Sequence, residues 1–426
     1  MIRGSLSALA LMLLMMTAAC RSEPQDDVTR ITVMVSGDPE EIEVYRAVVE
    51  AFDRSQTGVD ARLLPFADRE DLIVRLSTSI AGGEPPDLFL MNYRYYGQFA
   101  ARDALAPVDP YLRTSEVFSE KDFFAAAMTP FQWDGEQICL PQNVSSLVVY
   151  YNADLFADAG LGLPVEGWTW NDMLRSARAL TRDDDGDGTQ EVYGLGVEPE
   201  IIRLVPFIWS NGGTLVDDED APTRFDFDAR AVIAMQRFLD LRSVHGVTPT
   251  DVEAESENLE TRFLNGRLGM LMESRRVVPT LRTISSFGWD VAPLPFLSEQ
   301  VSVLHADAYC MTADSDAKDA SWRFIEFALG PEGQRITAEA GRTVPSLRAV
   351  ADSDAFLDPE ALPEHSEVFL EQIPRLREVP VVSTWAEIED VADGIVEEAY
   401  YFGGEALEVA VELTIQTRNL FARAER

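Results

Sequence analysis

The stretch ITVMVSGDPEEIEVYRAVVEAFDRSQTGVDARLLPFADREDLIVRLSTSIAGGEPPDLFLM, residues 31–91, decides the fold, because short apolar segments alternate in it with amphipathic ones. The apolar segments predict strands over 31–35, 61–64 and 87–91. Between the first two strands, apolar residues recur at helical spacing: Ile42, Tyr45, Val49 and Phe52. The order β-α-β-α-β predicts an α/β fold with a mainly parallel sheet that helices cover on both faces.

Two loops of this stretch follow strands and are candidates for ligand binding. Residues 36–38 follow the first strand, and residues 92–96 follow the third. In open α/β sheets, ligands bind beyond the carboxyl ends of the strands, near helix N-termini. Asp38 also suits the N-cap of a helix that starts at Pro39, so a capping role competes with a binding role for this residue.

A second unit begins near Ser145, where a strand through residues 148–151 is followed by several helical segments. Prolines later in the chain, at Pro293 and Pro295 and within residues 344–346, interrupt the regular patterns. We expect the chain to cross between the two units at these prolines.

The N-terminus predicts export. Arg3 precedes a short apolar run, and small residues follow directly before Cys20. A run of this length is too short to span a bilayer stably and is typical of a signal peptide. The segment resembles the lipobox of bacterial lipoproteins, in which the cysteine is acylated and becomes the first mature residue. Thr17 stands where that motif usually has Leu. We therefore expect a signal peptide over 1–19 and a lipidated tether over 20–28, with plain secretion as the alternative.

The composition excludes some classes of partner. The chain has 73 acidic and 35 basic residues, for a formal charge of −38, and the acidic residues are spread along the sequence. A phosphate polymer would be repelled, so we expect no nucleic-acid binding. Apolar runs after the signal have the length of strands, which predicts no later membrane span. An acidic, lysine-poor surface also suits saline surroundings, where screening offsets self-repulsion.

Beyond Cys20 the chain has two cysteines, Cys139 and Cys310, so one disulfide is possible. An exported protein can keep such a bond. We favour two buried thiols that behave as small apolar groups.

No catalytic motif stands out, so we expect a protein that is not an enzyme. A Walker loop, a Gly-x-Ser-x-Gly elbow and a His-Glu-x-x-His motif are all missing from the sequence. The histidines, His245, His305 and His365, share no metal-ligand spacing. Paired carboxylates are too abundant here to select a glycosidase pair.

One acidic loop matches part of a calcium-binding pattern. Asp183, Asp185 and Asp187 occupy positions 1, 3 and 5 of a calcium loop, and Thr189 can offer its carbonyl at position 7. The twelfth position is a glycine, where an EF-hand has a glutamate, and Glu191 at the ninth could substitute. The sequence predicts a structural calcium site, with a solvated Asp- and Gly-rich turn as the alternative. No other cofactor is expected.

Several segments together resemble the bacterial extracellular solute-binding proteins of ABC importers, in particular the sugar-binding kind related to maltose-binding protein. The segments that carry the resemblance, which covers nearly the whole mature chain, are 36–52, 86–89, 149–156, 160–161, 168–170, 211–213, 266–272 and 331–334. Their order and spacing are more specific than any one of them.

The resemblance implies a two-lobed periplasmic-binding-protein type II fold, in which each lobe is a mixed sheet flanked by helices and the ligand cleft lies between the lobes at the hinge. By this likeness, lobe one covers 29–143 and 300–345, and lobe two covers 144–299 and 346–426. It also implies a substrate-binding lipoprotein, facing the periplasm or the cell exterior, that closes on a mono- or oligosaccharide and delivers it to the permease subunits in the membrane. We expect a monomer.

Binding of glycerol phosphate or another polar solute, sensing without transport, and a lipid-anchored glycoside hydrolase are the alternatives. Sugar recognition needs aromatic faces and planar polar groups. On that basis the expected ligand-binding residues are Asp38, Asn92, Tyr93, Arg94, Trp209, Asn211, Glu273, Tyr309, Arg342 and Trp385.

Overall fold

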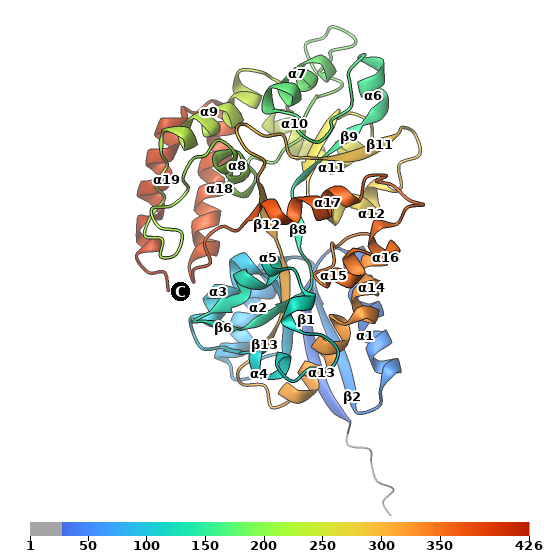
Figure 1. The fold of residues 1–426 in the computed structure, drawn as a ribbon. Coiled ribbons are helices and arrows are strands. Elements are labelled where there is room, and N and C mark those ends of the chain that lie inside the picture. The colour runs from blue at the N-terminus through green and yellow to red at the C-terminus, as the bar shows by residue number, and fades with distance from the viewer. Residues whose placement is uncertain (1–27, 426) are drawn as a thin grey trace, which may run out of the picture.

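The computed structural model describes residues 28–425, which form two lobes, each with its own sheet (Figure 1). The predicted signal peptide, and the tether up to residue 27, lie outside the described residues. Within residues 28–425, no helix combines the length and the apolar character that crossing a bilayer would need.

The larger sheet has the strand order β2-β1-β3-β13-β4, and β7 also pairs with β13. β1 is parallel to β2 and β3, as predicted, whereas β13 runs antiparallel to its neighbours, so the sheet is mixed. Its strands are β1 (Thr29–Ser36), β2 (Val59–Phe66), β3 (Leu88–Asn92), β4 (Leu105–Ala106), β7 (Cys139–Pro141) and β13 (Asp307–Thr312).

Local sequence signals explain the helices that cover this sheet. Asp38 caps the first helix by accepting the backbone N–H of Glu41, and a proline occupies the first turn. Asp68 caps the second helix in the same way. The helices of this part are α1 (Pro39–Ser55), α2 (Arg69–Ala81), α3 (Tyr93–Ala100), α4 (Asp109–Leu112), α5 (Ala125–Met128), α13 (Lys318–Ala328) and α14 (Pro331–Glu339). Single turns of 3-10 helix, η1 (Glu120–Asp122) and η2 (Thr129–Phe131), and a small hairpin of β5 (Gln132–Trp133) and β6 (Glu136–Gln137) join them.

The second lobe is built on a smaller antiparallel sheet with the order β10-β9-β11. Its strands, β9 (Val148–Asn152), β10 (Met270–Glu273) and β11 (Trp289–Pro293), are wholly buried. The elements between them are α6 (Ala153–Asp158), α7 (Trp170–Leu180), α8 (Ile201–Ser210), α9 (Ala229–Ser243), α10 (Asp251–Ser256), α11 (Leu259–Leu264), η3 (Arg275–Val277) and α12 (Val278–Leu281).

The last part of the chain returns along both lobes. Its long helix α18 packs on α8 and α9 and also touches α3, so it bridges the two lobes (Figure 1). Its elements are α15 (Arg348–Ala351), α16 (Asp354–Leu357), α17 (Glu367–Gln372), η4 (Ile373–Arg375), β14 (Leu376–Arg377), α18 (Trp385–Phe402) and α19 (Ala406–Phe421).

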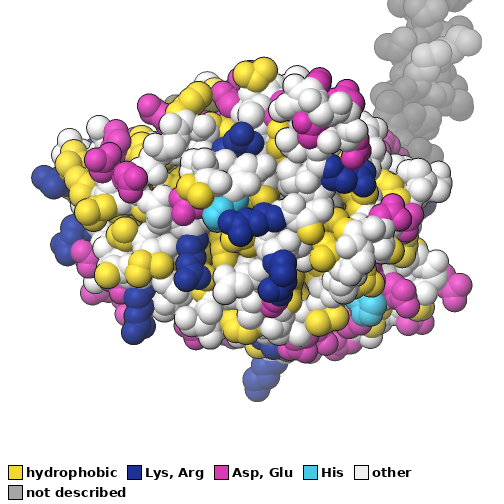
Figure 2. All heavy atoms as spheres, turned by 90° about the horizontal axis from the view of Figure 1, so that it is seen from above, with side chains coloured by type: hydrophobic (Ala, Val, Ile, Leu, Met, Phe, Trp, Pro, Cys, Tyr) yellow, Lys and Arg dark blue, Asp and Glu magenta, His cyan; other side chains and the backbone are white. Residues whose placement is uncertain are grey.

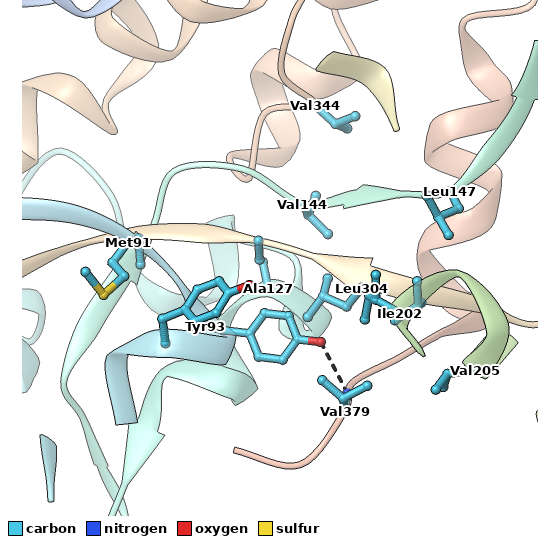
Figure 3. Packing of buried hydrophobic residues seen from close by; sticks show 14 of the residues in the cluster. Met91, Tyr93, Ala127, Val144, Leu147, Ile202, Val205, Leu304, Val344 and Val379 are labelled. Atoms are coloured by element: carbon cyan, nitrogen blue, oxygen red, sulfur yellow. Dashed lines mark hydrogen bonds between the residues drawn. The ribbon is translucent and has the colours of Figure 1, made fainter. Parts of the chain in front are cut away.

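A third, small sheet lies between the lobes, where β12 (Ser302–His305) pairs with β8 (Ser145–Ser146) and β14. Figure 3 shows its apolar surroundings, to which both lobes contribute: Val144 and Leu304 lie among Met91 and Tyr93 on one side and Ile202 and Val205 on the other. The chain passes through this region at β8 and again at β12, which identifies it as the hinge.

The prediction of two free thiols is wrong, because a disulfide joins Cys139 to Cys310. The two residues face each other in the antiparallel pair of β7 and β13, and both are fully buried. The sequence separation of 171 residues hides this pairing, since only the sheet register brings the two cysteines together.

On the lobe-two face seen from above in Figure 2, acidic, basic and apolar side chains are interspersed. This face therefore offers no continuous basic surface of the kind that nucleic acids bind.

Candidate functional site

A cleft of about 390 Å³ lies beyond the carboxyl ends of β1, β2 and β3, where the strand order predicts ligand binding. The ends of these strands and the loops after them line it with residues 36–38, 67–70 and 90–92 together with Arg94. Lobe two adds Ser274 and Arg276, and the hinge strands add Ser145 and His305. The volume is within the range of small-molecule sites.

Four predicted residues line this cleft: Asp38, Asn92, Arg94 and Arg342. Arg342 is 11% exposed and its Nη2 lies 2.6 Å from Oδ2 of Asp38 and 3.2 Å from Oε2 of Glu41. One arginine is thus shared by two carboxylates.

Glu41 is held in place by a further contact, since the Tyr45 hydroxyl donates to its Oε1 at 2.7 Å. Burial raises the pKa of Glu41, although Arg342 and the Tyr45 hydroxyl oppose the shift, and the nearby charge of Asp307 adds to it. The capping role expected of Asp38 is confirmed, since its Oδ1 caps α1, and its Oδ2 faces Arg342 in the cleft.

Arg94 is buried and forms an ion pair with Glu389 of α18, which joins the lobe-one wall to the C-terminal helix. Its Nε donates to Oδ1 of Asn92 at 3.1 Å, so Asn92 orients Arg94 rather than standing alone. The Trp385 indole N–H donates to the other oxygen of Glu389 at 3.0 Å. The charge of Glu389 raises the pKa of Arg94, while burial opposes that rise.

Asp393, one turn further along α18, accepts the backbone N–H of Ile201 at the start of α8. Burial and the charges of Glu389 and Glu200 raise the pKa of Asp393 to about 8.

The lobe-two wall is built around Glu273, which lies behind Arg276 and is 4% exposed. Its Oε2 lies 2.8 Å from Nη2 of both Arg203 and Arg276, and its Oε1 accepts the backbone N–H of Ser274. Despite burial, these neighbours lower the pKa of Glu273 to about 2. The predicted residue Glu273 therefore positions an arginine of the cleft instead of lining the cleft itself.

The hinge also places Asp307 beside His305 in the cleft lining, on the two sides of the turn between β12 and β13. Oδ2 of Asp307 accepts from the Asn143 amide at 2.9 Å. His305 has a buried Nε2 without a hydrogen-bond partner among the described residues. Burial and the charges of Arg94 and Arg203 hold the pKa of His305 well below its usual value, so the imidazole is neutral.

The predicted aromatic contacts lie outside the cleft. Tyr93, Tyr309 and Trp385 are at most 2% exposed and pack into the core. The Tyr93 hydroxyl accepts the backbone N–H of Val379 (Figure 3), and the Tyr309 ring packs edge-on against Phe324.

Two further predicted residues also lie elsewhere. Trp209 lines a separate cavity of about 340 Å³, where the Arg377 guanidinium lies 4.7 Å from its ring centre. Asn211 ends α8 and donates to the Arg230 carbonyl. Core packing is the usual role of large aromatic residues, and it accounts for the buried ones here.

Comparison with known proteins finds a family whose model matches this chain. The family model for bacterial extracellular solute-binding proteins matches residues 47–364. The chain belongs to that family. The resemblance in the sequence predicted this membership, which is confirmed.

Similar proteins agree with the two-lobed fold of this solute-binding protein. A putative binding protein of Brucella abortus is 21% identical and aligns over 85% of each chain. The structure of an ABC substrate-binding protein of Listeria monocytogenes in complex with cycloalternan has a TM-score of 0.85 at 23% identity, over 93% of this chain and all of that one. The sugar-binding protein MalE of Xanthomonas citri has a TM-score of 0.80 at 22% identity, over 93% and 98% of the two chains. The predicted type II two-lobed fold is confirmed.

The acidic loop of this solute-binding protein brings four predicted carboxylates together. One oxygen from each of Asp183, Asp185, Asp187 and Glu191 lies within 4.8 Å of the others, a spacing that fits a calcium ion. The same carboxylates also accept backbone N–H groups of their own loop, including those of Gly186, Gly188 and Thr189. The donor set fits calcium, and the turn is also well formed by its own hydrogen bonds.

Sequence reasoning missed several side chains of the cleft. Arg69 follows β2, so the rule that selected the loops after β1 and β3 also applies to it. Arg276, His305 and Asp307 are distant in sequence from that sheet region, and only the returning chain brings them to the cleft. No local signal marks these three.

Proposed function

We propose that this protein is the substrate-binding component of an ABC importer, that it captures a mono- or oligosaccharide between its lobes, and that it delivers the sugar to the permease. The observation that carries the proposal is the interlobe cleft, because planar polar groups from both lobes and the hinge converge there. Guanidinium groups donate hydrogen bonds to the hydroxyl groups of a sugar, carboxylates accept them, and amides do both. The sugar ligands named for similar proteins, such as cycloalternan, support the same class of solute.

Capture by closure is the mechanism proposed. The lobes would rotate about β8 and β12, with residues 29–143 and 300–345 moving as lobe one and residues 144–299 and 346–426 as lobe two. Closure on a solute removes it from water and strengthens every polar contact in the cleft. It also creates a closed surface for the permease to recognise. No bond is made or broken in this cycle.

The proposal includes export and a lipid anchor at Cys20, with residues up to 28 as the tether of a monomer that faces the periplasm or the cell exterior. Membership of an extracellular family supports export. The disulfide between Cys139 and Cys310 supports it as well, since such bonds persist in oxidising compartments.

A thermal-shift screen over monosaccharides, oligosaccharides, polyols and glycerol phosphates tests the proposal. A carbohydrate that binds should raise the melting temperature, be recovered unchanged after incubation, and reduce the radius of gyration in small-angle scattering. Release of cleaved product would identify an enzyme instead. The absence of any carbohydrate hit would overturn the sugar assignment.

Paired variants on one helix connect the binding to the cleft. Arg69→Ala removes a guanidinium that lines the cleft, and we expect it to weaken sugar binding about tenfold or more. Arg75→Ala changes an exposed arginine of the same helix and should leave the affinity unchanged. Equal affinities for the two variants would place the solute elsewhere.

A further inference from the structure

The cleft has a surplus of negative charge once its ion pairs are assigned. Of its four arginines, three are already paired with carboxylates of the protein: Arg94 with Glu389, Arg276 with Glu273 and Arg342 with Asp38. Glu389 and Glu273 reach these arginines from behind the cleft wall. These guanidinium groups therefore add little net positive charge to the cleft.

The remaining arginine, Arg69, has no carboxylate within ion-pair distance among the described residues. Its Nη1 donates to the Tyr95 hydroxyl at 3.0 Å, and its guanidinium lies 4.6 Å from the centre of the Tyr95 ring. Three lining carboxylates also lack an ion pair within residues 28–425, namely Asp68, Glu70 and Asp307. Among the lining groups without an ion pair, there is thus one guanidinium group and three carboxylates.

Asp307 is the best placed of these carboxylates to contact a solute. The Asn143 amide holds its Oδ2, and the Asp307 backbone N–H donates to Oδ1 of Asn143, so the residue is fixed by two hydrogen bonds. Its Oδ1 accepts no hydrogen bond from the described residues and is free for a ligand. Asp307 is also close enough to Glu41 to raise the pKa of that carboxyl group.

His305 provides an independent sign of a missing partner in the same cleft. Its Nε2 is buried and has no hydrogen-bond partner among the described residues, a condition that native structures normally relieve with a ligand or water. Because the imidazole is neutral, it does not offset the surplus of carboxylates.

We infer that the solute carries a protonated amino group, as an amino sugar or an aminated oligosaccharide does, and that this ammonium group lies against Asp307 and Glu41. The inference rests on the proposed function and specifies its substrate class. An ammonium group offers three donors and a full positive charge to this wall, which a neutral hydroxyl cannot match. A phosphate would meet unpaired carboxylates there, and three of the four cleft arginines are already paired with carboxylates of the protein.

Matched sugars separate this inference from the proposed function. Calorimetric titration would use a panel of mono-, di- and trisaccharides, each in a neutral, an amino, an N-acetylamino and a phosphorylated form. D-glucosamine, D-glucose, N-acetyl-D-glucosamine and glucosamine's β-1,4 dimer and trimer are part of it. We expect the tightest binder to be an amino form, at least about tenfold tighter than its N-acetylated and neutral counterparts.

Each outcome of the panel decides one of the two proposals. If a neutral, N-acetylated or phosphorylated sugar binds tightest, the inference fails while carbohydrate capture stands. Non-sugar amines are titrated beside the panel: if they bind and all sugars fail, the cationic solute stands and the carbohydrate assignment fails. If no compound binds, both fail.

A charge-only substitution tests the wall directly. Asp307→Asn keeps the shape and the hydrogen bond to Asn143, and we expect it to weaken binding of the amino sugar about tenfold or more while neutral sugars lose less than about threefold. Asp60→Asn, an exposed change on the opposite end of β2, is the control. Equal losses for charged and neutral sugars would overturn the role of the charge, and unchanged melting of the free variant would show that it is folded.

Discussion

The two walls of the cleft share charge in opposite ways. In lobe one, a single arginine, Arg342, is shared by the carboxylates of Asp38 and Glu41. In lobe two, a single carboxylate, Glu273, is shared by Arg203 and Arg276. The same side-chain type therefore responds in opposite directions, since the pKa of Glu41 is raised and the pKa of Glu273 is lowered to about 2.

The difference shows which group of each wall is indispensable. A buried carboxylate that contacts two guanidinium groups compensates part of the charge of each, and its removal leaves the buried Arg203 with less compensation. A carboxylate that competes with a neighbour for one guanidinium is partly redundant. The lobe-two wall should consequently depend on Glu273 for stability. The lobe-one wall instead has more carboxylate charge than its shared arginine compensates, and this charge is available to a solute.

The largest expected effect follows from Glu273→Ala. We expect a loss of about 3–5 kcal/mol in the free energy of unfolding at neutral pH, because Arg203 would remain buried with only the partly exposed Glu198 and Glu200 as ion-pair partners. Denaturant unfolding of the variant measures this loss.

The matched control is Glu260→Ala, which removes a second partner of Arg276 that is 24% exposed. It should cost less than about 1 kcal/mol, as partly exposed ion pairs do. Similar losses for the two variants would show that Glu273 has no special place in the lobe-two wall.

The next effect tests lobe one without changing its charge. The double variant Cys139→Ala/Cys310→Ala removes the disulfide between β7 and β13, and we expect a loss of about 2–4 kcal/mol. Hydrogen exchange should show faster opening in the lobe-one sheet, whereas Glu273→Ala should loosen β10 and its neighbours. The wild type in reducing agent is the control. Identical exchange patterns for both variants would mean that the lobes unfold as one unit.

The sequence predicted one wall of the cleft better than the other. Asp38, Asn92 and Arg94 were found because residues after buried strands lie at the carboxyl edge of a parallel sheet, and the same rule would have found Arg69. Asp307 and Arg276 escaped because the chain reaches the cleft there only after crossing the hinge. Tertiary packing, which no local pattern reports, places them.

The predicted aromatic residues lie away from the cleft for a different physical reason. A tryptophan in a helix has the same sequence signature whether it faces a core or a ligand, and Trp385 faces the core and a carboxylate. The fold itself was predictable, since the alternation of strands and helices over residues 31–91 and the order of the family segments are properties of the sequence alone.

Calcium is expected to act on lobe two only. The loop with Asp183, Asp185 and Asp187 lies between α7 and the strands of that lobe, so binding there should stabilise it by about 1.4 kcal/mol at ten times the dissociation constant. Asp185→Asn should abolish the rise in melting temperature, and magnesium should produce a smaller one. Calorimetry without heat at millimolar calcium would leave the turn stabilised by its own hydrogen bonds.

The smallest expected effect, that of Glu41→Gln, is also the sharpest test of the opposite pKa shifts. Because the folded protein raises the pKa of Glu41, its contribution to stability is present at low pH and is lost as the pH rises above the usual glutamate pKa of 4.5. Glu273 behaves in the opposite way: its contribution, on the order of 3 kcal/mol, is present above pH 4.5 and is lost as the pH falls toward 2. Glu41→Gln should therefore change stability at neutral pH by less than about 1 kcal/mol. Between pH 3 and 7, this variant should lose the contribution to the free energy of unfolding that decreases as the pH rises. Glu273→Gln should instead lose the contribution that increases as the pH rises. If both variants changed the pH profile in the same direction, the two walls would not hold charge in opposite ways.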